Sequence, residues 1–183
     1  MARRIAYTGA PVLTLDQVAF QCRAEAEDLQ PELIDQIIIP GVTAQGESRT
    51  GAAIREATYE EDWPASYPSG HSLDVGQVVA IESVSVLGHS GASSPYEGAV
   101  ELIQGGKESY LDFPDGRPEG RLRIRYRAGV DLEAHPGVRS WLLMAAETAF
   151  THRGVLIVGQ ALAEVPSSFV DHLLADITVP PRF

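Results

Sequence analysis

Residues 121–127 read Arg-Leu-Arg-Ile-Arg-Tyr-Arg, and this stretch carries the clearest secondary-structure signal in the chain. Charged and uncharged side chains alternate strictly, and a period of two is typical of a β-strand with one buried face. Successive side chains of a strand point to opposite faces. One face is therefore predicted to carry Arg121, Arg123, Arg125 and Arg127, and the other Leu122, Ile124 and Tyr126.

The row of four arginines has two interpretations. It can face an acidic partner, such as a neighbouring subunit, another protein surface or DNA. It can instead be a solvated sheet face paired with carboxylates of the same chain, such as Glu97 or Glu101. Isolated exposed ion pairs contribute little to stability and so do not explain four arginines in a row. The net charge of −11 makes DNA the least favoured partner, because proteins that grip the phosphate backbone are usually basic.

The segment around this strand, residues 53–130, is predicted to be rich in β structure. Residues 75–86 are rich in Val and Ile, as strands prefer. Tyr67-Pro68-Ser69-Gly70 has the composition of a turn. Gly105-Gly106-Lys107-Glu108-Ser109 lacks the upstream glycine of a phosphate-binding loop, and a tight hairpin turn is predicted there.

Helical periodicity flanks the β-rich segment on both sides. Residues 14–51 place apolar side chains at three- and four-residue spacing, with Thr14 and Gln17 forming a candidate capping box. Pro31 fits the first turn of a second helix, and Pro40 is predicted to kink or end it. A long helix is predicted from Pro136, followed by a shorter one around residues 167–174.

These patterns predict an α+β fold: a helical core, made of two N-terminal helices and a long C-terminal helix, that carries a β-rich insertion and ends in an extended tail. We expect residues 1–183 to form one domain. Its parts would be helical residues 1–52, the β-rich insertion 53–130, helical residues 135–174 and the tail 175–183.

The tail is predicted to be a docking element outside the fold. Its apolar residues alternate, and it closes with two prolines that favour an extended path. Such a segment suits addition to a sheet edge of another protein, with a terminal aromatic as an anchor. The alternative is a frayed end, as is common at termini. The docking residues would be Ile177, Val179, Pro180, Pro181, Arg182 and Phe183.

No catalytic or metal-binding arrangement emerges from the sequence. The histidines (His71, His89, His135, His152 and His172) form no helical metal-ligand pattern. Cys22 is the only cysteine, which excludes an internal disulfide and predicts a small buried side chain, with a reactive thiol as the alternative. We therefore expect no enzymatic activity, no catalytic residues, no cofactor and no metal.

Composition agrees with a folded protein of a cytosol-like compartment. Hydrophobic residues make up 44% and charged residues 21% of the 183 residues, as in globular proteins. No apolar run approaches the roughly 20 residues that span a bilayer, and no signal peptide follows the two N-terminal arginines. A membrane partner is therefore not expected.

In order and spacing, these segments resemble the head–tail connector (adaptor) family of long-tailed bacteriophages and gene transfer agents. The resemblance runs over nearly the whole chain. It is carried by residues 11–18, by the acidic residues 25–28, by Ile37-Ile38-Ile39-Pro40-Gly41-Val42, by residues 47–54 and 78–86, by Arg125-Tyr126-Arg127-Ala128-Gly129, and by residues 135–138, 149–153, 165–166 and 173–174.

The resemblance implies a structural, non-enzymatic protein of the virion neck, assembled in the host cytoplasm. It implies a homo-oligomeric ring, commonly of twelve subunits, beneath the capsid portal. The ring would extend the DNA channel, let DNA pass without specific binding, and present a docking surface to a stopper or tail-completion protein. The C-terminal tail would then reach the portal protein.

Two other functions stay open at this point. Another virion structural role, as a tail terminator or a capsid-decorating subunit, belongs to the same broad class. A small cytosolic enzyme or ligand-binding domain belongs to a different class, because pockets between helices and sheets are common and one sequence hides them.

Overall fold

The computed structural model describes residues 1–88, 92–152 and 172–181, without the side chains of residues 27 and 28. Contacts divide the chain into two compact units. The sheet unit comprises Met1–Ala10, Gly51–Val130 and Ile177–Phe183, and the helical unit comprises Pro11–Thr50 and Asp131–Asp176. Among the described residues, no helix is both long and apolar enough to cross a membrane.

The helical unit is built from four α-helices in the described part of the chain. They are α1 (Leu15–Cys22), α2 (Pro31–Leu33), α3 (Ile39–Thr50) and α4 (Pro136–Thr151), with a 3₁₀ turn η1 (Ala26–Leu29) and a π-helical turn η2 (Ile34–Ile38). The predicted capping box is confirmed, since the Thr14 hydroxyl accepts from the Gln17 N–H and the Gln17 side chain accepts from the Thr14 N–H. Pro31 stands in the first turn of α2, as predicted.

Pro40 does not end the second helix. The helical run continues from Pro31 to Thr50, and the π-helical turn η2 lies immediately before the proline. The Ile39 N–H donates to the Ile34 carbonyl, five residues back, so the helix is locally wider where Pro40 cannot donate. Of the two predicted effects of Pro40, a kink or an end, the helix shows no end, and its geometry departs from the α-helix in the turn before the proline.

The core of the helical unit lies where α4 meets α1, η2 and α3. Apolar side chains from each of these elements are buried there, and Trp141 of α4 is the largest. The side chain of Arg49 lies over the Trp141 ring, 6.0 Å from its centroid. The buried set includes Val18, Ala19, Ile34, Ile38, Val42, Val138, Leu142 and Ala146.

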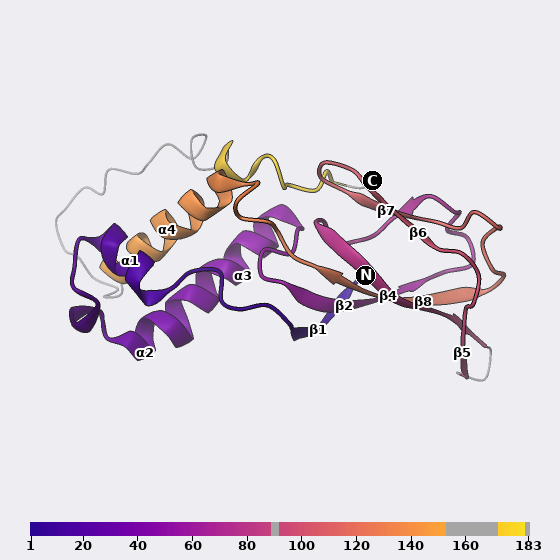
Figure 1. Cartoon of the computed structure of the whole chain (residues 1–183), viewed down its shortest axis with the longest axis horizontal. Helices are drawn as coiled ribbons and strands as arrows, with labels where there is room; N and C mark the ends of the chain where they lie inside the picture. The colour runs from indigo at the N-terminus through magenta and orange to yellow at the C-terminus, as the bar shows by residue number, and fades with distance from the viewer. Residues whose placement is uncertain (89–91, 153–171, 182–183) are drawn as a thin grey trace. The chain divides into compact units, whose positions relative to one another are not determined.

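The sheet unit contains two antiparallel sheets. The larger has the strand order β1-β2-β8-β4-β5, and Figure 1 shows β8 in its centre between β2 and β4. The smaller has the order β3-β7-β6. The bounds are β1 (Arg3–Tyr7), β2 (Ala57–Trp63), β3 (His71–Ser72), β4 (Val78–Leu87), β5 (Ser93–Pro95), β6 (Glu101–Gln104), β7 (Ser109–Asp112) and β8 (Arg121–Ala128). The hairpin predicted at residues 105–109 is confirmed as the turn between β6 and β7.

One hydrophobic core joins the two sheets. The apolar residues of β8 are fully buried in it, as their alternation predicted, together with Trp63 of β2 and Leu111 of β7. Tyr59 and Tyr126 stack with ring centroids 5.9 Å apart. The remaining members are Ala53, Ala57, Leu73, Val78, Val84, Phe113, Leu122, Ile124 and Ala128.

The fold class predicted from the sequence is wrong. The prediction was a helical core with two N-terminal helices, a long C-terminal helix and a β insertion. The structure instead has two antiparallel sheets with a core of their own, and its first element is the strand β1, which the sequence did not predict. A sheet that buries one face against another sheet is self-sufficient and needs no helical core to cover it.

The start of the C-terminal tail belongs to the fold. Ile177 is completely buried, and a Cβ on Gly51 would stand 3.4 Å from the Val179 side chain. The prediction that the tail from residue 175 lies outside the fold is therefore wrong for Ile177, because its apolar side chain already has a partner surface. Pro180 and Pro181 are exposed. Arg182, Phe183 and most of the helix predicted around residues 167–174 lie outside the described residues.

Candidate functional site

The arginine row of β8 covers the outer face of the five-stranded sheet. Leu122, Ile124 and Tyr126 are fully buried on the inner face, so the arginines between them must point the other way. The side chains of Arg121, Arg123, Arg125 and Arg127 remain 65%, 42%, 46% and 41% exposed, respectively. The alternation predicted from the sequence is confirmed.

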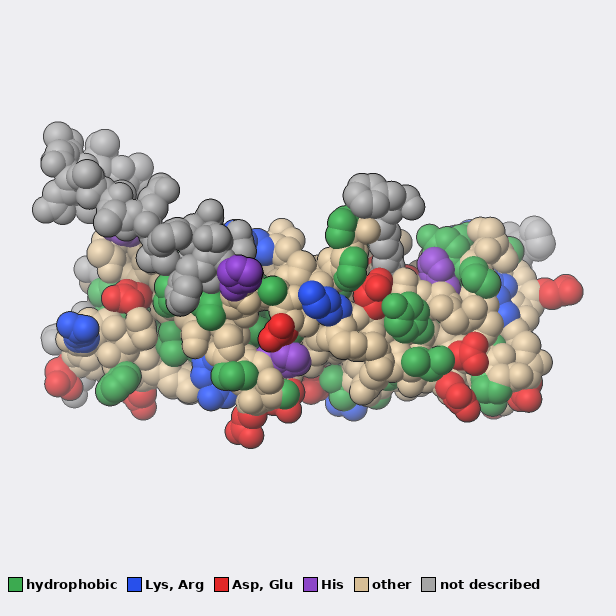
Figure 2. Space-filling model, turned by 90° about the horizontal axis from the view of Figure 1, so that it is seen from above, with side chains coloured by type: hydrophobic (Ala, Val, Ile, Leu, Met, Phe, Trp, Pro, Cys, Tyr) green, Lys and Arg blue, Asp and Glu red, His purple; other side chains and the backbone are tan. Residues whose placement is uncertain are grey.

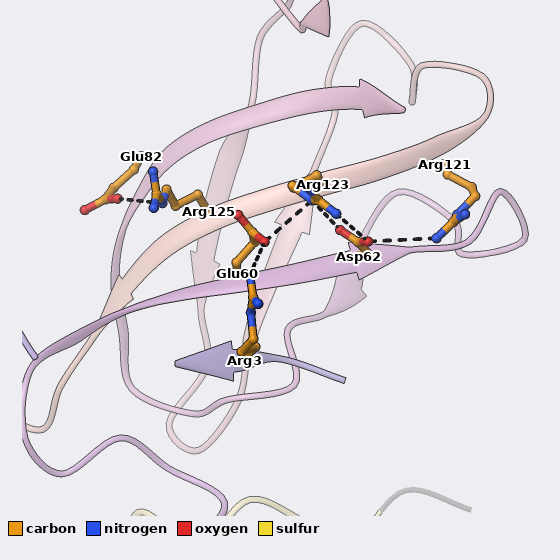
Figure 3. Close-up of polar contacts among 7 residues, drawn as sticks. All are labelled: Arg3, Glu60, Asp62, Glu82, Arg121, Arg123 and Arg125. Carbon is orange, nitrogen blue, oxygen red and sulfur yellow. Dashed lines mark hydrogen bonds and ion pairs between the residues drawn. The ribbon is translucent and has the colours of Figure 1, made fainter. Parts of the chain in front are cut away.

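Strand β2 supplies the first set of carboxylates on this face. Asp62 lies opposite Arg123 in the strand register, and Glu60 lies opposite Arg125. The Arg123 guanidinium donates two hydrogen bonds to Asp62, at 2.8 and 2.9 Å, which is the bidentate geometry that arginine and carboxylate favour. Glu60 accepts a hydrogen bond from Arg3 of β1 at 3.1 Å, as Figure 3 shows.

Two further carboxylates come from a bulge and a strand end. The β4–β8 register shifts between Ile81 and Ser83, and Glu82 is the residue at that shift. Bulges re-aim side chains in this way, and Glu82 stands within 4.0 Å of both Arg125 and Arg127. Glu56, just before β2, accepts a hydrogen bond from Arg127 at 3.1 Å.

Two glycines that are distant in sequence, Gly9 and Gly129, pack directly against Glu56 and leave room for it beside Arg127. A Cβ on Gly129 would stand 2.7 Å from the Glu56 Cα, and one on Gly9 would stand 2.8 Å from the Glu56 Cβ. Because real Cβ contacts do not approach so closely, neither position accepts a side chain without moving the backbone. The Thr8 and Gly9 N–H groups donate to the Glu56 carbonyl, which holds the residue beside Arg127.

Hydrogen bonding on this face shifts two pKa values. The bond from Arg123 holds the pKa of Asp62 below its usual value, and the same contact raises the pKa of Arg123. This pair therefore stays ionised over the whole physiological range. We call the outer face that carries the β8 arginines and their partners Glu56, Glu60, Asp62 and Glu82 the ion-pair face.

The acidic partners differ from those suggested by the sequence. If the arginines paired with carboxylates of the same chain, the sequence suggested Glu97 and Glu101 as partners. In the structure the partners are instead Glu56, Glu60, Asp62 and Glu82. The nearest signal was in β2, where Glu60 and Asp62 stand between the aromatic residues Tyr59 and Trp63, but Glu61 interrupts the alternation. The role of the arginines at a subunit boundary stays a prediction.

A buried carboxylate lies on the opposite face of the same strand. Glu61 is 2% exposed, and its two oxygens accept from Trp63 Nε1 at 2.7 Å, the Asp74 N–H at 3.0 Å and the Tyr126 hydroxyl at 3.0 Å. Burial raises the pKa of Glu61, and the hydrogen bonds that it accepts, first that from the Asp74 N–H, offset part of this increase. Burial also raises the pKa of Tyr126, followed by the proximity of Glu61. The side chains of Glu61, Trp63 and Tyr126 are all buried, so this network lies within the core.

The remaining His, Cys, Asp and Glu residues form no further candidate site in the part of the chain that the structure describes. Residues 1–88, 92–152 and 172–181 contain no group of three or more His, Cys, Asp or Glu side chains that could hold a metal. Cys22 is half-buried, and burial, followed by Glu147, raises the pKa of its thiol, so little of it is the reactive thiolate. His89 lies outside the described residues. The absence of enzymatic activity stays a prediction.

The two units differ strongly in charge. The helical unit holds thirteen Asp and Glu residues against four arginines, a net charge of −9. The sheet unit holds twelve acids against ten Lys and Arg residues, a net charge of −2. The two values account for the −11 of the whole chain. The acidic excess is therefore a property of the helical unit.

The fold matches chains of gene transfer agent (GTA) particles. No protein-family model and no curated protein sequence matches the chain. Three solved structures match over 100% of this chain and 97% of the matched one: the neck of an empty GTA particle computed with C6 symmetry (16% identity, TM-score 0.76), the virion of a native GTA particle (18%, 0.74) and the neck of a native GTA particle computed with C12 symmetry (14%, 0.68). The chain thus shares its fold with chains of these GTA particles.

Proposed function

We propose that this chain is a structural subunit of the neck of a phage-like particle, specifically the head–tail connector (adaptor) that forms a ring beneath the capsid portal. The whole-chain correspondence with chains of GTA necks supports this proposal. The motifs between residues 11 and 174 that resemble the connector family support it independently. The ring would extend the DNA channel and present a docking surface to a stopper or tail-completion protein.

Ring formation is the first expected result. Purified alone or together with a portal protein from the same particle, the chain is expected to form a closed ring of about twelve copies, since repeated head-to-tail contacts close when the rotation allows it. Sedimentation and electron-microscope imaging with rotational averaging would measure the number. Particles that contain no copy of this chain in their neck would contradict the proposal.

The charge of the helical unit suits a channel through which DNA must pass. A surface with a net charge of −9 repels phosphates and so does not retain the duplex. We therefore propose that the helical unit supplies the inner surface of the ring.

Weak DNA binding is the corresponding expected result. The isolated protein is expected to bind duplex DNA no more tightly than about 10⁻⁴ M at physiological salt, the weak end of non-specific binding. Fluorescence anisotropy with a labelled duplex at several salt concentrations would measure this. Tight binding that weakens steeply with salt would contradict an acidic inner surface.

A further inference from the structure

The four arginines of the ion-pair face fall into two kinds. Arg123 and Arg127 make hydrogen bonds to carboxylates of the same chain, at 2.8 and 3.1 Å. The nearest carboxylate oxygens to Arg121 and Arg125 are 3.8 and 4.0 Å away, on Asp62 and Glu82. These separations exceed hydrogen-bond range, so both guanidiniums are only loosely paired. Figure 3 shows the difference between Arg123, clamped to Asp62, and its two neighbours in the row.

Arg121 and Arg125 are also the two most exposed members of the row, at 65% and 46%. They stand four residues apart on one strand, a spacing of roughly 13 Å. Asp62 and Glu82 are each more closely engaged elsewhere, by Arg123 at 2.8 Å and by Thr58 at 3.3 Å. The face therefore presents two separated cations whose hydrogen-bonding capacity is unused within the sheet unit.

Carboxylates that could meet these arginines are plentiful on the helical unit. Figure 2 shows acidic side chains, in red, at several places over the helices. Four of them are exposed and have no ion pair with any described residue: Asp16, Glu25, Glu32 and Asp35. The helical unit, with a net charge of −9, is thus opposite in charge to the loosely paired arginines.

We propose that Arg121 and Arg125 bind carboxylates on the helical unit of a second copy of this chain. The inference rests on the proposed ring, in which every interface joins two different surfaces of identical subunits. Arg123 and Arg127 hold the sheet face in place and do not contact the neighbour. DNA is the weaker candidate, because Asp62 and Glu82 flank the two arginines and would repel phosphates.

Zero-length crosslinking can identify the carboxylates that Arg121 and Arg125 meet. Lys107 is the only lysine in the sequence, so a carbodiimide that couples amines to carboxylates has little background. The variant R121K/R125K keeps both positive charges and places amines at the two positions. The matched control R123K/R127K places amines at the two tightly paired positions. Mixing isotope-labelled with unlabelled protein before assembly distinguishes crosslinks between copies from crosslinks within one copy.

In assembled rings, we expect R121K/R125K to give mixed-isotope crosslinks to acids of the helical unit. The control should couple to Asp62 and Glu56 within its own chain. Crosslinks from R121K/R125K only to Asp62, Glu82 or other carboxylates of the same copy would overturn the inference. The inference would also be overturned if the wild-type protein bound duplex DNA and R121E/R125E abolished that binding.

Charge reversal separates this inference from the proposed function. We expect R121E/R125E to weaken ring assembly by a factor of about ten or more, with a smaller salt dependence than the wild type, while the fold is retained. Rings that form equally well from R121E/R125E would overturn the inference and leave the proposed function standing. Failure of the wild-type chain to form a ring, alone or with portal protein, would instead contradict the proposed function, and the inference with it.

Discussion

Replacing Glu61 with glutamine is expected to lower the free energy of unfolding of the sheet unit by about 2–4 kcal/mol. The buried Glu61 carboxylate accepts from Trp63 Nε1, the Asp74 N–H and the Tyr126 hydroxyl. Glutamine has one acceptor oxygen and an NH₂ group that cannot accept, so in either orientation at least one buried donor loses its partner. Urea unfolding followed by tryptophan fluorescence would measure the change, because Trp63 belongs to the same core.

The effect of E61Q should depend on pH in a defined direction. Burial raises the pKa of Glu61, so the folded state keeps the proton at pH values where the unfolded chain has released it. The stability that this proton contributes is fully present below the unfolded pKa and is lost as the pH rises through the folded pKa. Glutamine does not titrate. The stability difference between wild type and E61Q should therefore shrink as the pH rises, and a difference that grows with pH would contradict the raised pKa.

Glu60 provides the matched control. It is the adjacent residue on β2 but lies on the ion-pair face, where it pairs with Arg3 and Arg123. Exposed ion pairs contribute at most about 1 kcal/mol, so E60Q should change stability little. Equal stability of E61Q and E60Q would show that the buried network does not stabilise the fold.

The alternation within β8 predicted which side chains share each face of the strand, but not which strands lie beside it. Alternation alone placed four arginines on one side and three buried residues on the other, as the structure confirms. The partners of these arginines lie far away in sequence: Asp62 is 61 residues from Arg123, and Glu56 is 71 residues from Arg127. Periodicity within one strand contains no information about which strand pairs with it, or in which register.

The prediction of the fold class was wrong for a related reason. Residues 14–51 and 136–151 show long apolar stripes that are easily recognised as helices. The β core is assembled instead from short pieces, including single residues such as Leu73 and Phe113, whose burial depends on pairing between distant segments. Strand β1, which has a register shift between Arg4 and Ala6, was missed because four of its five residues are exposed and it therefore shows no alternating buried face. Bulges of this kind also placed Glu82 on the ion-pair face, which no local pattern signalled.

The C-terminal segment requires a different expectation from the one its sequence suggested. An apolar stretch after the last helix can dock on a partner or pack on its own chain, and alternation does not distinguish the two. In the structure, Ile177 is 0% exposed. Val179 also packs closely, since a Cβ on Gly76 would stand only 2.7 Å from its Cγ2 atom and 2.8 Å from the Lys107 carbonyl oxygen. The first part of the tail is thus held in the sheet unit, while Pro180 and Pro181 are exposed.

Replacing Ile177 with alanine is therefore expected to cost about 2–4 kcal/mol, since it removes a buried side chain and leaves a cavity. Urea unfolding of I177A against the wild type would measure the cost. Deletion of residues 180–183 is the matched control: it should leave stability within about 0.5 kcal/mol of the wild type, because surface changes away from packed groups cost little. The same deletion tests the proposed docking of Pro180, Pro181, Arg182 and Phe183, which predicts that attachment to the portal protein is lost. Full stability of I177A would show that the tail does not anchor in the sheet unit, and full attachment of the shortened chain would contradict docking by its last four residues.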